Sequence, residues 1–159
     1  MNPANSPLPL EEFKMGPDDQ GLPFDINSIA GMGPMGVAPH PHRHEFYELL
    51  FVTHGSGFHV IDFEPFPISP PALYAIAPGQ VHFWDIDSPV KGQLIIFTDG
   101  FLQLASHQEA SKLLFNVFHD PARLPILSLE PSQTLLVSEL FCAMTNEYHN
   151  QNVSRAAML

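Results

Sequence analysis

The middle of the chain alternates between short apolar segments and turn-forming residues. Between residues 42 and 97, Gly, Pro, Asp and Ser interrupt the apolar or alternating segments roughly every 8–12 residues. That spacing is typical of an all-β sandwich or barrel and differs from the alternation of strands with helices. The predicted strands are 46–52, 57–63, 72–77, 81–86 and 93–97, with an earlier one at 24–29.

Two sequences within this region predict tight turns. His54-Gly55-Ser56-Gly57 predicts a hairpin, and Ala77-Pro78-Gly79-Gln80 predicts a turn of the Pro-Gly type. After residue 99 the apolar positions fall three to four residues apart, which indicates helices. Pro131 is well placed as the first residue of the last of these helices, and 124–129 is predicted to be a short extended piece.

These patterns predict one small domain with appendages. We expect a flexible N-terminal arm over residues 1–23, a β-barrel over 24–99 and a helical segment over 100–159. In the last helix, Leu136, Leu140 and Met144 form an apolar stripe. That stripe either packs on the barrel or forms a subunit interface, and the sequence leaves both open.

Composition and charge exclude several classes of protein. The 159 residues are 45% hydrophobic and 14% charged, which is enough apolar character for a core. Six Lys and Arg against 17 Asp and Glu give a net charge of −11, which argues against binding of nucleic acid or an anionic membrane by this segment. We find no membrane-spanning apolar run and no secretion signal, and the single Cys142 excludes an internal disulfide. We therefore expect a cytoplasmic protein.

The chemistry of the chain is concentrated in one predicted strand. Alternate residues of a strand face the same side, so two imidazoles and a carboxylate share one face of the segment that follows Pro41. The residues on that face are His42, His44, Phe46 and Glu48. Such donors suit a divalent transition metal. His82 follows the Pro-Gly turn with Trp84 on its own face, so adjacent strands would bring three His and one Glu together at the barrel mouth.

These residues resemble a known family. The spacing of Gly36, His42, His44, Glu48 and Gly55 reproduces the first cupin motif in full. The second motif is matched in part, with Gly79 and His82 present. It departs at Pro71, Ala77 and Ile86, where the motif has glycine, proline and asparagine. Residues 42–52 and 77–82 further resemble the N-terminal sensing domain of AraC-family transcription regulators.

The resemblance implies both a fold and a function. It implies a cupin-type double-stranded β-helix (jelly-roll) barrel with a C-terminal α-helical dimerisation segment. It also implies a small-molecule effector in the barrel, a homodimer formed through the C-terminal helices, and DNA binding through a separate helix-turn-helix domain. We expect that domain to lie outside this sequence.

The candidate site has two interpretations. The predicted ligand-binding residues are His42, His44, Phe46, Glu48, His82 and Trp84. In the first interpretation, His42, His44, Glu48 and His82 hold Zn, Ni, Fe or Mn. In the second, they are polar residues of the barrel interior that hydrogen-bond one another or the effector. No residue is predicted to be catalytic.

Two rival functions remain open. Metal-dependent cupin enzymes of the dioxygenase or isomerase type also use three His and one Glu. The resemblance therefore makes such an enzyme the alternative function. A stand-alone cupin that binds a small molecule is the third possibility.

Several other residues carry structural expectations only. Most of the aromatic side chains Phe46, Phe58, Tyr74, Phe83 and Trp84 are predicted to be barrel core, and Cys142 is predicted to be buried. The remaining histidines have no partner pattern and are predicted to lie on the surface or in turns. They are His40, His54, His59, His107, His119 and His149.

Overall fold

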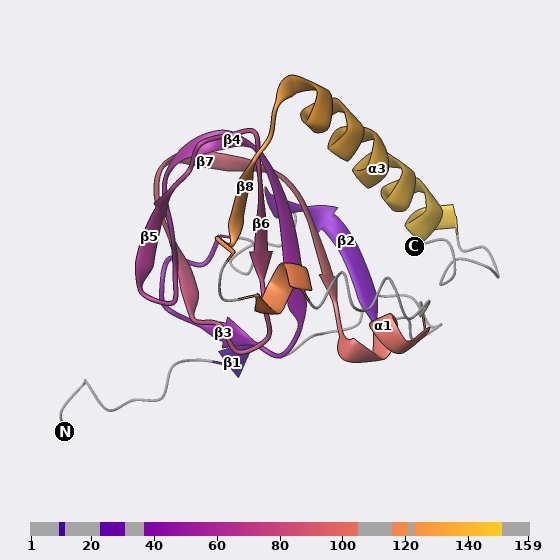
Figure 1. Ribbon diagram of the computed structural model, residues 1–159, viewed down its shortest axis with the longest axis horizontal. Helices are drawn as coiled ribbons and strands as arrows, with labels where there is room; N and C mark the ends of the chain where they lie inside the picture. The colour runs from indigo at the N-terminus through magenta and orange to yellow at the C-terminus, as the bar shows by residue number, and fades with distance from the viewer. Residues whose placement is uncertain (1–9, 12–22, 31–36, 105–115, 121–122, 151–159) are drawn as a thin grey trace.

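The predicted all-β barrel is confirmed. A computed structural model describes residues 10–11, 23–30, 37–104, 116–120 and 123–150. Its strands curl around a common interior, and one long helix runs along the outside (Figure 1). Within the described residues, no helix is long and apolar enough to cross a membrane. The strands are β1 (Leu10–Glu11), β2 (Phe24–Ser28), β3 (Arg43–His44), β4 (Tyr47–Ile61), β5 (Glu64–Pro67), β6 (Ala72–Ile76), β7 (His82–Phe97) and β8 (Ile126–Ser128).

The main sheet is antiparallel and is dominated by two long strands. Its order is β2-β7-β4-β6-β8, and β5 pairs with the far end of β4. Because β4 and β7 pair along most of their length, they form the curved wall of the barrel. The helices are α1 (Asp99–Leu104) and α3 (Pro131–Asn150), and residues 116–119 are also helical. Pro131 is thus the first residue of α3, as predicted.

The hairpin predicted at residues 54–57 is wrong. The chain continues through this sequence as one strand, β4, whose pairing with β7 shifts register between Val52 and Gly57. Such bulges bend a strand without reversing it. Gly57 has φ +124° and approaches β7 so closely that a Cβ would collide with the carbonyl oxygen of Asp85. The reversal falls instead at Asp62 and Phe63, which both have positive φ.

Two apolar clusters lie on opposite faces of the sheet. Alternate residues of β4 divide between them, with Leu50 and Val52 inside the barrel and Tyr47 and Phe51 outside. The interior is filled by buried side chains from all the long strands. They are Ile29, Phe46, Leu50, Val52, Ile61, Ile68, Ala72, Tyr74, Ile76, Trp84, Val90, Leu94 and Ile96.

The outer cluster joins the helices to the barrel. From α3, Phe141 and Tyr148 are buried against the sheet, and Phe51 and Phe141 place their ring centroids 5.5 Å apart. Leu136 and Leu140 are more than half exposed, so of the predicted stripe only Met144 packs on this cluster. Cys142 is exposed, and the prediction that it is buried is wrong.

The sheet also takes in chain from both flanking segments. β8 pairs with β6, so the region after residue 99 contributes a strand, in agreement with the extended piece predicted at 124–129. Leu10 and Glu11 pair in parallel with Arg43 and His44. The rest of the predicted arm, the helical positions at 105–115 and the helix predicted near the C-terminus lie outside the described residues. The division at residues 23 and 99 stays a prediction.

Candidate functional site

The predicted histidine strand and the residue after the Pro-Gly turn lie side by side. His42 and His82 form an antiparallel bridge in which each backbone N–H donates to the other residue's carbonyl, at 3.1 and 2.9 Å. The turn has the predicted form, because Gln80 N–H donates to the Ala77 carbonyl and Gly79 has φ +83°. The Gly79 N–H donates to the His44 carbonyl at 2.9 Å, which fixes the turn against β3.

The alternation predicted for this strand is present. His42, His44, Phe46 and Glu48 are all buried, whereas Arg43 and Glu45 between them are exposed. With His82, which is also buried, they bring three imidazoles and a carboxylate together. We refer to His42, His44, Glu48 and His82 as the His–Glu cluster.

Three donor atoms of the cluster converge. One ligand atom each of His44, Glu48 and His82 lies within 4.8 Å of the other two. The distance from Glu48 Oε2 is 3.5 Å to His44 Nε2 and 4.0 Å to His82 Nε2. These distances are too long for good hydrogen bonds, and none of the three atoms has a hydrogen-bond partner. The fourth member, His42, is packed beside this set, with its ring centroid 4.3 Å from that of His82.

The other ring nitrogens of two histidines are held by backbone carbonyls. Nδ1 of His44 lies 2.7 Å from the Phe46 carbonyl, and Nδ1 of His42 lies 3.0 Å from the His40 carbonyl. A carbonyl only accepts, so each Nδ1 carries the proton, and in the neutral ring each Nε2 carries a lone pair. This arrangement is typical of histidines that bind metals. The Phe46 ring also stacks on the His44 ring at 4.0 Å.

His59 is a buried member of the site that the sequence prediction missed. Its Nε2 lies 3.1 Å from Nδ1 of His82, and its ring stacks on that of Trp84 at 3.8 Å. The signal was present in the alternation of β4, which places His59 on the same inward face as Ile61. The same alternation turns Phe58 outward, where it is 42% exposed, whereas Phe46, Tyr74 and Trp84 are buried, so the prediction that most of these aromatic side chains are barrel core is confirmed.

Burial keeps the inner histidines neutral. Desolvation, followed by the neighbouring imidazoles of His42 and His44, lowers the pKa of His59 to about 3. Desolvation, with the rings of His59, His44 and His42, also lowers the pKa of His82. Neutral imidazoles are metal ligands and hydrogen-bond partners, whereas imidazolium ions are donors only.

A surface hollow borders the cluster at His44. The hollow has a volume of about 360 Å³ and is lined by Arg43, His44, Glu45, Pro78 and Gly79. On the other side of the cluster the buried apolar side chains fill the interior. A ligand that contacts the cluster through this hollow would therefore meet His44 first.

Of the other histidines predicted to lie at the surface, those described are exposed. They are His40, His54, His119 and His149. His119 nevertheless has a partner, because its Nε2 lies 3.1 Å from the hydroxyl of Tyr47, which also donates to Asp99 at 3.1 Å. Burial and that contact with Asp99 raise the pKa of Tyr47 to about 12. His107 lies outside the described residues.

Comparison with known proteins gives a matching family and similar solved structures. The model of the AraC-like ligand binding domain matches residues 33–156. No curated protein matches the chain. A solved structure of ToxT from Vibrio cholerae is similar at 11% identity with a TM-score of 0.44, over 74% of this chain and 47% of the ToxT chain. The chain therefore spans about half the length of ToxT. Since the family match extends over most of the sequence, from ahead of the histidine strand to beyond α3, the chain belongs to the AraC-like ligand binding domains.

Proposed function

We propose that this chain is the effector-sensing and dimerisation part of an AraC-type transcription regulator of the cytoplasm. A small molecule binds at the His–Glu cluster, and the signal passes to a DNA-binding domain outside these 159 residues. Membership of the ligand-binding family supports this function. The net charge of −11 supports the separation of sensing from DNA binding, because phosphate contacts need cations.

The observation that carries the proposal is the group of three buried side-chain atoms that have no hydrogen-bond partner. Leaving a buried polar group unpaired costs about 1–3 kcal/mol. His44 Nε2, Glu48 Oε2 and His82 Nε2 share one small space, so a single bound species would satisfy all three. We infer that the cluster is built for a ligand and is not a closed hydrogen-bonded network.

The donor set fits a divalent transition metal. Metal–nitrogen bonds of about 2.1 Å place neighbouring ligands about 3.0–3.4 Å apart. The separations of 3.5 and 4.0 Å from Glu48 Oε2 are close to that range, and small side-chain rotations would close the difference. His44, Glu48 and His82 would hold Zn, Ni, Fe or Mn, with the predicted fourth ligand His42 packed beside them, and the metal would supply an open position for an oxygen or nitrogen of the effector.

The two predicted pocket aromatics support the donors. Phe46 stacks directly on His44. Trp84 is connected to the cluster through His59: it stacks on the His59 ring, and His59 in turn contacts His82. A ligand bound to His44 would therefore lie nearer Phe46 than Trp84.

Two backbone connections offer routes from the cluster to the rest of the molecule. β1 pairs beside His44, so the described part of the arm adjoins the cluster. On β4, Glu48 points inward while its neighbour Tyr47 points outward and hydrogen-bonds Asp99 and His119. An effector with different affinities for two arrangements of these contacts would shift their populations.

The exposed side of α3 supports dimerisation. Leu136 and Leu140 lie one turn apart and are more than half exposed. The double variant Leu136→Glu/Leu140→Glu should convert a dimer to a monomer by light scattering, whereas Asn146→Glu, on another face of α3, should not. A monomeric wild type, or a double variant that stays dimeric, would contradict this part of the proposal.

Metal binding is tested first. Untagged protein, loaded separately with Zn, Ni, Mn or Fe, is analysed for metal content and thermal unfolding. We expect one ion per chain, and about 2.7 kcal/mol of stabilisation at a hundredfold the dissociation constant. Glu48→Gln and His44→Ala should lose both effects, while the exposed control His54→Ala keeps them.

Metabolites are then screened against loaded and metal-free protein. We expect a compound that raises the unfolding temperature of the loaded wild type only and is recovered unchanged. Recovery of a converted product would favour the cupin enzyme instead. A hit that stabilises the His44→Ala variant equally would place the effector elsewhere.

A further inference from the structure

His59 is a fully buried histidine outside the His–Glu cluster. It lies on the inward face of β4, in register with Trp84 of β7, and its Nε2 lies 3.1 Å from Nδ1 of His82. The neighbouring inward position on β4 holds Ile61, and burying an imidazole in such a place is less favourable than burying an aliphatic side chain. The presence of His59 therefore calls for a role beyond filling the barrel.

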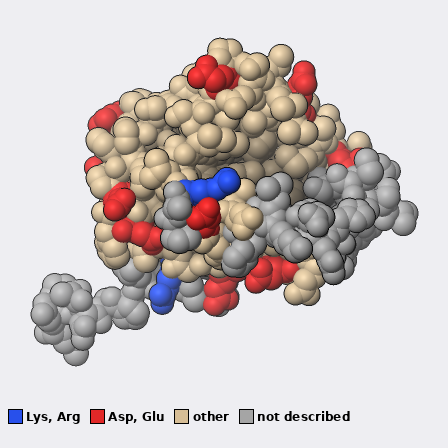
Figure 2. All heavy atoms as spheres, viewed as in Figure 1, with Lys and Arg blue, Asp and Glu red and all other residues tan. Residues whose placement is uncertain are grey.

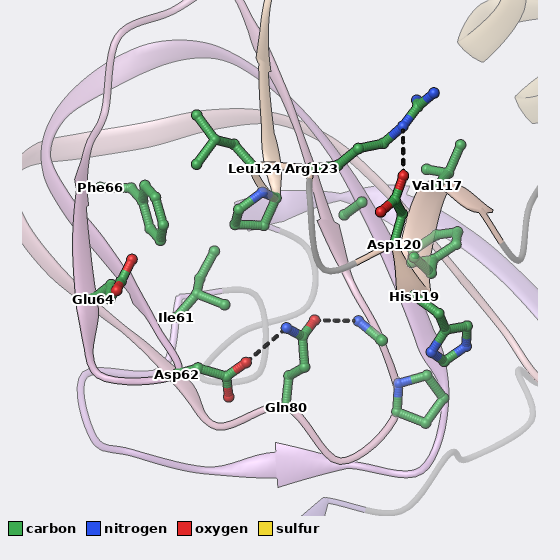
Figure 3. Close-up of a pocket in the computed structure, with 15 residues that line it drawn as sticks. Ile61, Asp62, Glu64, Phe66, Gln80, Val117, His119, Asp120, Arg123 and Leu124 are labelled. Atoms are coloured by element: carbon green, nitrogen blue, oxygen red, sulfur yellow. Dashed lines mark hydrogen bonds and ion pairs between the residues drawn. The ribbon is translucent and has the colours of Figure 1, made fainter.

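The backbone around His82 is fixed without help from the barrel interior. His82 pairs with His42, and the Asp62 N–H donates to the carbonyl of Val81 at 2.7 Å. The Asp62 carboxylate accepts in return from the Val81 N–H at 3.1 Å. It also accepts from the Gln80 side-chain amide at 2.8 Å (Figure 3). The main chain at His82 is thus held from both sides, and the direction of its imidazole is what a further contact can set.

The partner of Nδ1 decides what each histidine of the cluster presents at Nε2. In His42 and His44 that partner is a backbone carbonyl, which only accepts, whereas in His82 it is the Nε2 atom of His59. When His82 donates its Nδ1–H to His59, its Nε2 keeps the lone pair that a metal requires. With the bond reversed, Nε2 of His82 would carry a proton and could not bind a metal.

We propose that His59 is a positioning residue of the metal site, which accepts the Nδ1–H of His82 and holds the Nε2 lone pair of His82 toward Glu48. This inference rests on the proposed metal site. Trp84 fixes the plane of the accepting ring, because it stacks on His59 at 3.8 Å with an interplanar angle of 9°. Nδ1 of His59 then carries the proton of that ring and has no hydrogen-bond partner. An unpaired buried N–H is unfavourable, so we attribute its presence to this role.

Zinc affinity of two variants at position 59 tests the role. His59→Phe keeps an aromatic ring beside Trp84 but removes the acceptor, so the affinity should fall about 10- to 100-fold. His59→Gln offers a side-chain oxygen as the acceptor and should restore most of the affinity. The control Tyr74→Phe removes a hydroxyl from a buried ring whose centroid is 5.4 Å from that of His59, and it should bind zinc as the wild type does. Urea unfolding checks that each variant is folded.

Zinc at the surface must be separated from zinc at the cluster. The chain has a net charge of −11, and acidic side chains outnumber basic ones on the face shown in Figure 2. Divalent ions therefore collect weakly at the surface, and salt screens this attraction. The affinities are measured by competition with a chelator at physiological ionic strength, and Glu48→Gln supplies the background.

Nitrogen NMR of protein with labelled histidines reads the direction of the hydrogen bond. In the zinc-loaded wild type we expect scalar coupling between Nδ1 of His82 and Nε2 of His59, with the shared proton bonded to His82. A histidine that only fills space would give no such coupling. In metal-free protein the coupling should also be present, because the two nitrogens lie within hydrogen-bonding distance without a metal.

The outcomes separate this role from the metal site itself. The role alone is overturned if His59→Phe binds zinc as tightly as the wild type, or if His59→Gln binds as weakly as His59→Phe. It is also overturned by a shared proton bonded to His59 in the zinc-loaded protein, or by rings without coupling in either state. A wild type that binds zinc no better than Glu48→Gln contradicts the proposed metal site, and this role with it.

Discussion

The neutral, buried state of His59 and His82 predicts a loss of stability in mild acid. Both have folded-state pKa values below the ordinary 6.5, about 3 for His59. In mild acid, below pH 6.5, the unfolded chain therefore binds protons that the folded chain excludes. The free energy of unfolding must fall as the pH falls through this window, and the contribution of these two residues is fully present only above it.

The size of the effect follows from the ordinary histidine pKa. Between pH 7.5 and 5.5, a histidine that titrates at 6.5 only when unfolded lowers the free energy of unfolding by about 1.4 kcal/mol. His59 and His82 together then account for about 2.7 kcal/mol. His54 is exposed and therefore serves as the control position.

Urea unfolding of chelator-treated protein at several pH values measures this slope. In His59→Gln the amide keeps a hydrogen-bonding group beside His82 but cannot titrate, so the loss between pH 7.5 and 5.5 should fall by about half. His54→Gln should keep the wild-type slope. A free energy that is flat over this range, or a slope unaltered by His59→Gln, would refute the assignment of buried neutral imidazoles.

Four further substitutions test the fold. Phe141→Ala should destabilise the protein by about 3–5 kcal/mol in urea unfolding, whereas Leu136→Ala on the exposed side should cost less than about 1 kcal/mol in a monomer. Gly57→Ala should cost several kcal/mol, about 3 or more, because both its backbone conformation and the close approach of β7 exclude a side chain; an unchanged midpoint would contradict the bulge. Tyr47→Phe should lower the free energy of unfolding by about 1–2 kcal/mol, because the hydroxyl's contacts with Asp99 and His119 are lost. Equal stability of the variant and the wild type would show that these contacts are not formed in solution.

Local alternation was enough to predict the inner face of the histidine strand. His42, His44, Phe46 and Glu48 fall on one face because the strand period is two, whatever the strand packs against. The turn ahead of His82 was also predictable, because Gly79 needs a positive φ that proline at the preceding position favours. These two features bring the candidate site together.

The long-range geometry was not predictable from the same pattern. Gly55 and Gly57 suit either a hairpin or a bulged strand, and only the pairing of β4 with β7 selects the bulge. His59 was assigned to the surface because its neighbours suggested no partner. Its partners, His82 and Trp84, come from β7, more than twenty residues away.

The side of α3 that packs on the barrel was also ambiguous. Apolar residues occur all around this helix, so periodicity alone does not show which stripe is buried. The barrel presents Phe51 to the helix, and this aromatic surface selects Phe141 while leaving Leu136 and Leu140 in solvent. Cys142 follows Phe141 along the helix and faces away from the barrel, so it is exposed.

An anomalous difference map from crystals grown with Zn, Ni, Fe or Mn tests the central claim most directly. We expect a single strong peak between Nε2 of His44, Oε2 of Glu48 and Nε2 of His82, absent in crystals of the Glu48→Gln variant. A map without a peak there in metal-saturated crystals, or with water or a side chain joining the three atoms, would contradict it.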